Sequence, residues 1–322
     1  MASKNTEKTP EQELQDKIRA DQEYIIKNKR VRRQTRRRAI VIILLVFLLI
    51  IALLAGATYT IMRFVDESNF RVSVTQMGTQ WLALSKSSDA LSTEWKSVLD
   101  VSAPKNMDNC TLCGYLDDLL PQMIATDGTF GERGSEVYYI ASTFYLKNAG
   151  STDVRYNETI TLERAMRNMD KAIRIILVKD TDIEDDKPGE IVAYAAYASD
   201  ANGVTLYDAN GAPIREAVVP DIEGGYDPRK ISYYNGLTFD ENDFDENGNW
   251  LAKPFVGDGY VHKSNYYPIS PGQKIKYTVL IWLEGQDPQC VGDNDSLIDA
   301  ERGILGGQVK LSVEFGTETE TK

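Results

Sequence analysis

The residue types that most often carry chemistry are few in this chain, and they are widely spaced. There are 3 cysteines, Cys110, Cys113 and Cys290, and a single histidine, His262. Three arrangements of the thiols are open: a loop closed by the first pair, a long-range disulfide from either member to Cys290, or a zinc site that also uses His262. Nothing in the sequence brings Cys290 or His262 near the first pair. We therefore treat the three cysteines as disulfide candidates first.

An acidic loop offers a second kind of site. Asp243, Asp245 and Asn247 place oxygen atoms at positions one, three and five of a calcium-binding loop, and the glycine required at position six is present. Asn249 adds a further oxygen, but Pro254 stands at position twelve, where such a loop needs a bidentate glutamate. The sequence predicts a calcium site with an incomplete set of ligands, and a solvated acidic turn is the alternative.

Catalytic arrangements find little support in the sequence. A zinc peptidase needs two histidines one helical turn apart, and a serine hydrolase of the α/β class needs a Gly-x-Ser-x-Gly turn that presents its nucleophile. The chain has 1 histidine and neither motif, and it lacks the Gly-x-x-x-x-Gly-Lys loop that cradles phosphates. We predict that the protein is not an enzyme, with an exported metal-dependent enzyme as the least favoured alternative.

Aromatic residues gather in a stretch of the C-terminal half that is rich in Gly, Asn and Asp. Aromatic side chains on polar loops suit stacking on sugars or contact with other proteins. Packing at the rim of the fold is the alternative. The residues concerned are Tyr233, Tyr234, Trp250, Tyr260, Tyr266 and Tyr267.

The longest uncharged run decides where the chain resides. Ala39–Met62 contains no formal charge, and as a helix it would be about 36 Å long at roughly 1.5 Å per residue. Because the hydrocarbon core of a bilayer is about 30 Å thick, this run is predicted to cross a membrane once. Ala57 ends a small-x-small sequence that signal peptidases recognise, so cleavage is the alternative. The apolar continuation to Met62 favours a retained signal anchor.

The charges around this run predict its orientation. The first 38 residues carry a net charge of +6, and the rest of the chain carries −18. Basic residues beside a span resist translocation, so we expect the N-terminus in the cytoplasm and the C-terminal domain outside the cell. The basic cluster next to the span is expected to face anionic lipid, and nucleic acid is not an expected partner. The cluster consists of Arg32, Arg33, Arg36, Arg37 and Arg38.

The elements that must position these residues are mostly strands. Short runs rich in branched and aromatic residues follow one another after about residue 137, with turn signals between them. No regular helix separates them, which favours an all-β, antiparallel β-sandwich of the jelly-roll or immunoglobulin-like kind over a parallel α/β sheet. The predicted strands are Val137–Leu146, Val154–Leu162, Ala172–Val178, Ile191–Ala198, Val204–Tyr207, Ile214–Val219, Ile275–Leu283 and Gln308–Phe315.

The segment before these strands is less regular. Leu112–Ala125 has leucines at helical spacing, interrupted by Pro121, and we predict a short helical insertion there. Phe70–Ser85 suits either a first strand or a helix that leaves the membrane. The predicted domains are a cytoplasmic basic tail (1–38), a transmembrane signal anchor (39–63), a membrane-proximal segment with the helical insertion (64–136) and an extracellular β-sandwich domain (137–322).

Several runs of the exported part resemble surface proteins of Gram-positive bacteria. These runs read TFYLKNAGS at 143–151, AIRI at 172–175, SPGQ at 270–273 and YTVLIWLEG at 277–285. They are similar to the camelysin and TasA group of cell-surface and biofilm-matrix proteins. The resemblance implies a jelly-roll sandwich and a role in a matrix or in adhesion. The long basic tail departs from the matrix proteins and favours tethering at the cell surface.

These observations predict a single-pass membrane protein that displays an acidic β-sandwich for adhesion, matrix or envelope interactions. The expected partners are the lipid bilayer together with further copies of the chain, other surface or matrix proteins, or glycans. The alternative is a secreted matrix or fibre subunit released after Ala57. No cofactor is expected apart from the calcium ion considered above.

Overall fold

The computed structural model describes residues 70–75, 82–101, 113–125, 129–130, 139–181, 183, 189–220, 226–230, 237–257, 259–290 and 307–318, with the single residues Arg19, Tyr24, Lys27 and Phe47. The chain divides into two compact units, Met1–Glu67 and Ser68–Lys322. The predicted span, apart from Phe47, and the arginine cluster before it lie outside the described residues. Within the described part of the chain, no helix combines the length and apolar character needed to cross a membrane.

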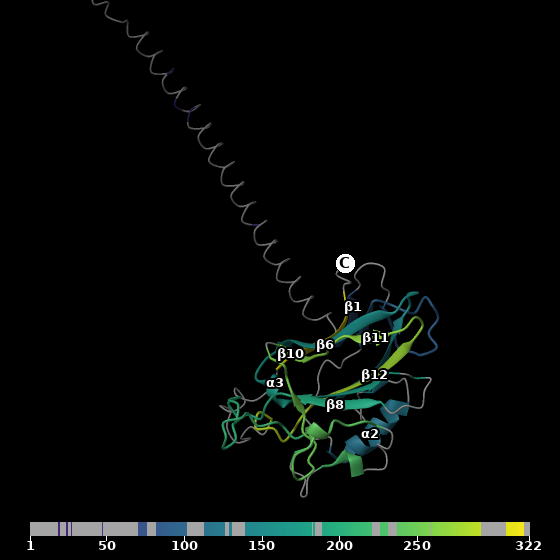
Figure 1. The fold of residues 1–322 in the computed structure, drawn as a ribbon. Coiled ribbons are helices and arrows are strands. Elements are labelled where there is room, and N and C mark those ends of the chain that lie inside the picture. Colours follow the sequence, from purple (N-terminus) through teal and green to yellow (C-terminus); the bar gives the residue numbers. More distant parts are fainter. Residues whose placement is uncertain are drawn as a thin grey trace, which may run out of the picture. The chain divides into compact units, whose positions relative to one another are not determined.

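The second unit is built from two sheets that pack face to face (Figure 1). In the first sheet the strand order is β10-β6-β13-β1-β3, and β11 also pairs with β6. Its strands are β1 (Phe70–Thr75), β3 (Val98–Val101), β6 (Val154–Ala165), β10 (Tyr260–Lys263), β11 (Tyr267–Ile269) and β13 (Val309–Thr317).

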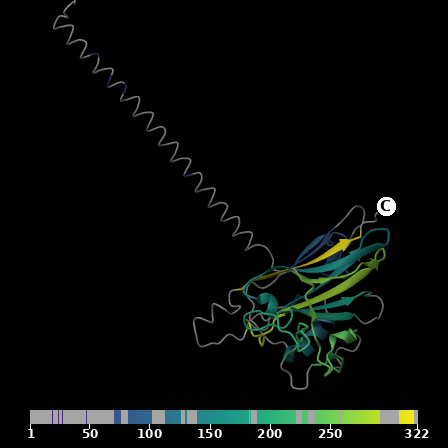
Figure 2. The same ribbon diagram turned by 60° about the vertical axis from the view of Figure 1, so that its left-hand side comes forward.

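The second sheet has the order β2-β5-β12-β7-β8-β9, and β4 also pairs with β5. Its strands are β2 (Leu82–Ser85), β4 (Thr129–Phe130), β5 (Tyr139–Asn148), β7 (Ile173–Asp180), β8 (Glu190–Ala195), β9 (Lys253–Pro254) and β12 (Lys274–Leu283). The helical elements are α2 (Cys113–Ala125), α3 (Met169–Ala172) and the 3-10 turns η1 (Pro228–Lys230) and η3 (Glu241–Asp243). A mostly β, sandwich-like fold is thereby confirmed, and the turned view shows its two layers (Figure 2).

The prediction of purely antiparallel sheets is wrong at two pairings. β1 runs parallel to β13, with Phe70 opposite Leu311, and β8 runs parallel to β9. Parallel neighbours need a long connection, because the chain must return to the same end of the sheet. The chain between β1 and β13 includes nearly the whole unit and all strands of the second sheet.

The first three strands lie in the segment predicted to be membrane-proximal, and they belong to the two sheets of the sandwich. β1 pairs with β13 in the first sheet, and β2 pairs with β5 in the second. Phe70, Val72 and Val74 alternate with more exposed residues along β1, so one face of this strand is buried in the core. The sandwich therefore includes strands from Phe70 onward.

Two predicted strands are replaced by a looser extension. Val204–Tyr207 and Ile214–Val219 form only isolated bridges, such as that between Tyr207 and Pro213. The extension contains two Asp-Ala-Asn-Gly turns, in which the carboxylates of Asp200 and Asp208 accept hydrogen bonds from the backbone N–H groups two and four residues later. These local bonds favour turns over a continuous ladder.

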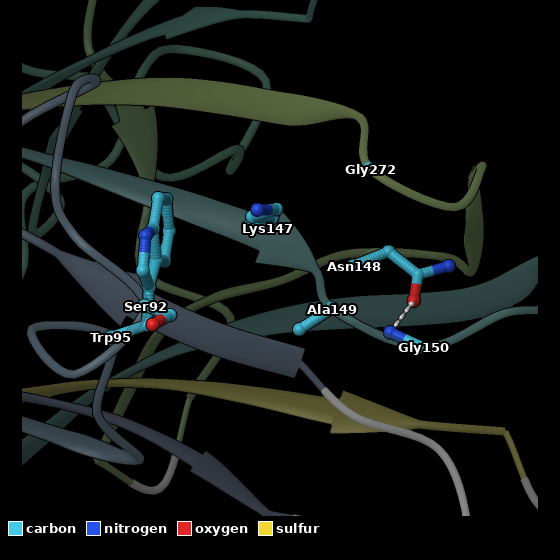
Figure 3. A pocket seen from close by; sticks show the side chains of 7 residues that line it. All are labelled: Ser92, Trp95, Lys147, Asn148, Ala149, Gly150 and Gly272. Atoms are coloured by element: carbon cyan, nitrogen blue, oxygen red, sulfur yellow. Dashed lines mark hydrogen bonds between the residues drawn. The ribbon is translucent and has the colours of Figure 1, made fainter.

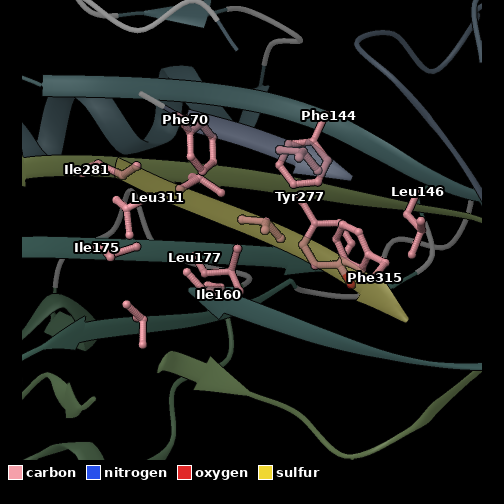
Figure 4. Close-up of a cluster of buried hydrophobic side chains, with 14 of the residues drawn as sticks. Phe70, Phe144, Leu146, Ile160, Ile175, Leu177, Tyr277, Ile281, Leu311 and Phe315 are labelled. Carbon is pink, nitrogen blue, oxygen red and sulfur yellow. The ribbon is translucent and has the colours of Figure 1, made fainter. Parts of the chain in front are cut away.

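The main core lies between the two sheets (Figure 4). The Phe144 ring from β5 stacks on Tyr277 from β12, with the ring centroids 5.4 Å apart, and meets Phe315 from β13 edge-on at 6.1 Å. Aromatic pairs in these arrangements contribute roughly 0.5–1.5 kcal/mol beyond the area they bury. The aromatic contacts therefore join one sheet to the other.

A second apolar cluster covers the outer face of the second sheet. Leu116 and Leu120 of α2 are fully buried in the same cluster as Leu280 and Trp282 of β12. In Figure 1 α2 lies on the side of β8 and β12 that faces away from β6 and β10. The predicted helical insertion is confirmed, and the helix continues through Pro121, which interrupts the leucine pattern in the sequence.

Candidate functional site

A buried ion pair joins the two sheets. Glu158 of β6 and Lys179 of β7 face each other across the interior, with Lys179 Nζ 3.2 Å from Glu158 Oε2. The Tyr277 hydroxyl donates a second hydrogen bond to the same oxygen at 2.7 Å. Both charged side chains are only 6% exposed, so the carboxylate has exchanged water for protein donors.

The other carboxylate oxygen faces the single histidine. His262 Nε2 of β10 lies 3.4 Å from Glu158 Oε1, and its ring packs against Tyr194 with the centroids 5.1 Å apart. The hydroxyls of Tyr156 and Tyr277 lie 3.0 Å apart and extend the network. Side chains from both sheets therefore meet around one carboxylate.

Aromatic rings surround the ammonium group of Lys179. Its Nζ lies 3.6 Å from the ring centroid of Tyr267, 5.4 Å from that of Tyr156 and 5.8 Å from that of Tyr277. The negative faces of aromatic rings attract a cation, and more strongly where water is excluded. The ammonium group is therefore in contact with aromatic rings in an interior position.

Burial and neighbouring groups shift the pKa values of Glu158 and Tyr277 in opposite directions. Burial raises the pKa of Glu158, but His262, Lys179 and the Tyr277 hydroxyl outweigh that effect and bring the pKa below its ordinary value. Burial and the nearby Glu158 charge raise the pKa of Tyr277 well above its ordinary value. The carboxylate stays ionised and the phenol stays protonated at neutral pH, which suits a structural connection better than proton transfer.

A nearby serine does not provide a nucleophile to this network. The Ser264 oxygen accepts a hydrogen bond from the Glu158 backbone N–H and donates one to the Asn265 carbonyl. The hydroxyl is thus committed to the backbone. In this part of the structure, the His262–Glu158 pair lacks the third member that a hydrolase requires.

A second buried network is centred on an arginine. Arg174 of β7 donates two hydrogen bonds to Asp287, at 2.9 and 2.8 Å, and lies 3.3 Å from Glu216. Glu284 accepts from the Trp282 indole N–H close by. One guanidinium group is therefore within ion-pair distance of two carboxylates.

The excess of negative charge in this cluster changes its titration. Burial raises the pKa of Asp287 to about 7, against the opposing charge of Arg174 and with the support of Glu216 and Glu284. Burial also raises the pKa of Glu216. As the pH falls below neutral, the Asp287 carboxylate is therefore expected to take up a proton.

This protonation should make the stability of the domain depend on pH. Between the unfolded and folded pKa values the native state holds a proton that the unfolded chain has lost, so the free energy of unfolding contributed by Asp287 falls as the pH rises from about 4 to about 7. One such group contributes at most about 1.4 kcal/mol per pH unit. Glu216→Gln removes one competing charge and should reduce the slope in urea unfolding measured across this range. The exposed Glu318→Gln should not, and equal slopes for wild type and Glu216→Gln would contradict the assignment.

Basic side chains contact the predicted calcium-binding loop. Asp243 is buried and accepts a hydrogen bond from Arg215 at 2.7 Å, and Lys253 lies 3.5 Å from its other oxygen. Asp245 accepts hydrogen bonds from the backbone N–H groups of Asn247 and Asn249 and from the Asn249 side chain. The first two predicted ligands therefore already have protein donors.

Metal binding by this loop stays a prediction that the geometry does not support. Across the described part of the chain, no group of three or more His, Cys, Asp or Glu side chains is arranged to hold a metal ion. The loop has the same turn geometry as the two Asp-Ala-Asn-Gly turns, with Gly248 at a φ of +83°. Only glycine adopts that conformation readily, which accounts for the glycine without a metal.

The predicted cysteine and arginine sites are described only in part. Cys110 and the arginine cluster lie outside the described residues, and Cys113 is the first residue of α2. Cys290 follows the second sheet and is partly buried, packing against the main core. No disulfide is present among the described residues. The cysteine pairings stay predictions.

The predicted aromatic group is divided by the fold. Trp250 is buried under the second sheet, where it packs edge-on against Phe239 at 5.6 Å. Tyr260, Tyr266 and Tyr267 are about two-fifths exposed, at 42%, 39% and 38%. Tyr233 and Tyr234 lie outside the described residues.

A surface pocket of about 340 Å³ lies at one end of the second sheet. Trp95, from the loop between β2 and β3, and Lys147, near the end of β5, line it together (Figure 3). The turns that follow β5 and precede β12 complete its wall through Ala149, Gly150 and Gly272.

The sequence analysis did not identify the two buried networks, although the strand pattern contains a signal for one of them. In β6 the buried positions follow a period of two through Val154, Tyr156 and Ile160, which places Glu158 on the inward face. In β7 the same period leads from Ile175 to Lys179. Opposite charges at inward positions of two strands predict an ion pair, whereas the partner strand cannot be read from either run alone.

In comparisons with known proteins, the sequence matches no family, and no curated protein is significantly similar to it.

Proposed function

We propose that this chain is a single-pass membrane protein that displays its β-sandwich at the cell surface for adhesion, matrix or envelope interactions. The observation that carries the proposal is the uncharged run Ala39–Met62 with a dense basic cluster directly before it. The apolar run supplies the tether, and the basic cluster keeps the N-terminal tail in the cytoplasm. The acidic domain is then outside the cell.

A binding role for the sandwich is supported by the state of its interior charges. Glu158 and Lys179 are paired with each other, and Arg174 is paired with Asp287. The first of these pairs joins the two sheets, the second lies on the second sheet, and neither contains an activated nucleophile. The surface features are better suited to contact: exposed aromatic residues on the first sheet and a pocket at one end of the second.

The finer fold assignment belongs to the same proposal. A jelly-roll or immunoglobulin-like sandwich of the camelysin and TasA kind is consistent with two mixed sheets and with the runs at 143–151 and 277–285. We propose that kinship for the exported part only. The basic tail favours an anchored protein over a matrix subunit.

The mature N-terminus distinguishes the anchored protein from a secreted subunit. Mass spectrometry of the protein isolated from cells should recover peptides on both sides of Ala57, because the apolar run continues to Met62 and is expected to be retained. A mature chain that begins at Thr58 would establish the released form and remove the anchor.

A further inference from the structure

The pocket at the end of the second sheet lies on a face that is otherwise covered. Lys147 sits between Leu146 and Asn148, and the Leu146 side chain belongs to the core between the sheets, so Lys147 is on the outer face. At the other end of this face α2 covers Trp282 and Leu280. At the end near Lys147, the face is bordered by the loop that carries Trp95. This end is open to solvent.

The walls of the pocket are held in place from beneath. The buried Asn148 side chain donates to the carbonyl groups of Thr152 and Ile269, at 2.8 and 2.9 Å, and accepts from the Gly150 N–H at 2.9 Å. Its backbone carbonyl accepts from the Gly272 N–H at 2.8 Å. One residue thus fixes both turns before any ligand arrives, which lowers the ordering cost of binding.

The pocket is positively charged in an acidic domain. Lys147 of β5 stands directly opposite Lys274 of β12 in the strand register. Like charges at opposed positions are destabilising, yet the chain after residue 38 has a net charge of −18. Lys147 lies over the Trp95 ring at 5.2 Å, and Lys274 donates to the Ser88 carbonyl at 2.8 Å. Within the described residues, neither lysine has a carboxylate partner.

We propose that this pocket binds a sugar unit that bears an acid group, with Trp95 against the sugar ring and Lys147 facing the acid, while Lys274 adds its positive charge from the neighbouring strand. An aromatic face suits the apolar C–H side of a sugar, and such a ligand supplies the anion that the two lysines do not have among the described residues. A volume of about 340 Å³ is at the lower end of the range for small-ligand pockets and fits a short saccharide segment. The inference rests on the proposed function, because it names the ligand class for a surface-displayed domain.

The test uses the full-length chain in detergent micelles, titrated with trigalacturonic acid and with the neutral cellotriose. Calorimetry should detect binding of the acidic trisaccharide only, and both Trp95→Ala and Lys147→Gln should weaken it at least tenfold. Higher salt should weaken it further, because the lysines are solvent-accessible. Thermal unfolding of each variant checks that the fold is retained, and Lys147→Gln is the milder change.

The first sheet offers a matched control. Lys263 Nζ lies 5.9 Å from the Tyr260 ring centroid, which makes a second exposed lysine–aromatic pair away from the pocket. Lys263→Gln removes an exposed positive charge outside the pocket and should leave binding unchanged. Absence of binding, equal binding of the neutral trisaccharide, or equal loss in Lys263→Gln would each overturn the proposal. None of these outcomes bears on membrane orientation, which is measured separately.

Discussion

Lys179→Met is expected to lower the free energy of unfolding by about 3–5 kcal/mol, because it leaves the Glu158 carboxylate buried without its main counter-charge. Methionine replaces the aliphatic stem of the lysine, so the loss is mainly electrostatic. Urea unfolding at pH 7, followed by tryptophan fluorescence, measures the effect. The tyrosine rings around the ammonium group would lose their cation as well.

Two controls separate the ion pair from general damage to the core. Arg155→Ala removes a surface pair with Glu318, whose side chains are 58% and 41% exposed, and should cost no more than about 1 kcal/mol. The double variant Lys179→Met with Glu158→Gln removes both charges and should recover much of the lost stability. A loss below about 1 kcal/mol in the single variant would show that the pair does not connect the sheets.

Local pattern was enough to predict the longer strands and the helix. The alternation in β6 and β13 reflects one face turned to the core, whereas the continuous apolar run of β12 reflects burial on both faces. The leucines of α2 repeat at helical spacing because one side of the helix covers the second sheet. In these elements, the spacing of the apolar residues in the sequence matches the faces that are buried in the structure.

Long-range pairing could not be predicted in the same way. β1 is parallel to β13, and no residue in Phe70–Thr75 specifies a partner so distant in the sequence. Val204–Tyr207 has the composition of a strand, but the Asp200 and Asp208 turns on either side satisfy their own backbone groups. Trp250 lies in a polar stretch and is nevertheless buried. The first and last of these features depend on tertiary contacts, whereas the second depends on local side chain–backbone hydrogen bonds.

The candidate sites show the same division. The calcium loop has the residue types of a metal site, but Arg215 and Lys253 reach Asp243 from other parts of the chain. The pocket depends on Trp95, Lys147 and Gly272, which three separate segments bring together. A site formed by strand register is visible only once the register is known.

The basic cluster before the span should decide the orientation of the chain. Replacing Arg32, Arg33, Arg36, Arg37 and Arg38 with glutamine removes most of the positive charge next to Ala39–Met62. The run itself keeps its affinity for lipid, so the variant should stay in the membrane fraction while part of it inserts with the opposite orientation. Unchanged orientation would show that another feature of the chain controls it.

The most direct test of the account is the position of the two termini in intact cells. An epitope placed after Lys322 should be accessible to antibody without permeabilisation, whereas an epitope placed before residue 1 should become accessible only after it. This result follows from a single span with basic residues on its cytoplasmic side. An accessible N-terminal epitope with a protected C-terminal one would contradict the orientation, and with it the surface role proposed for the sandwich.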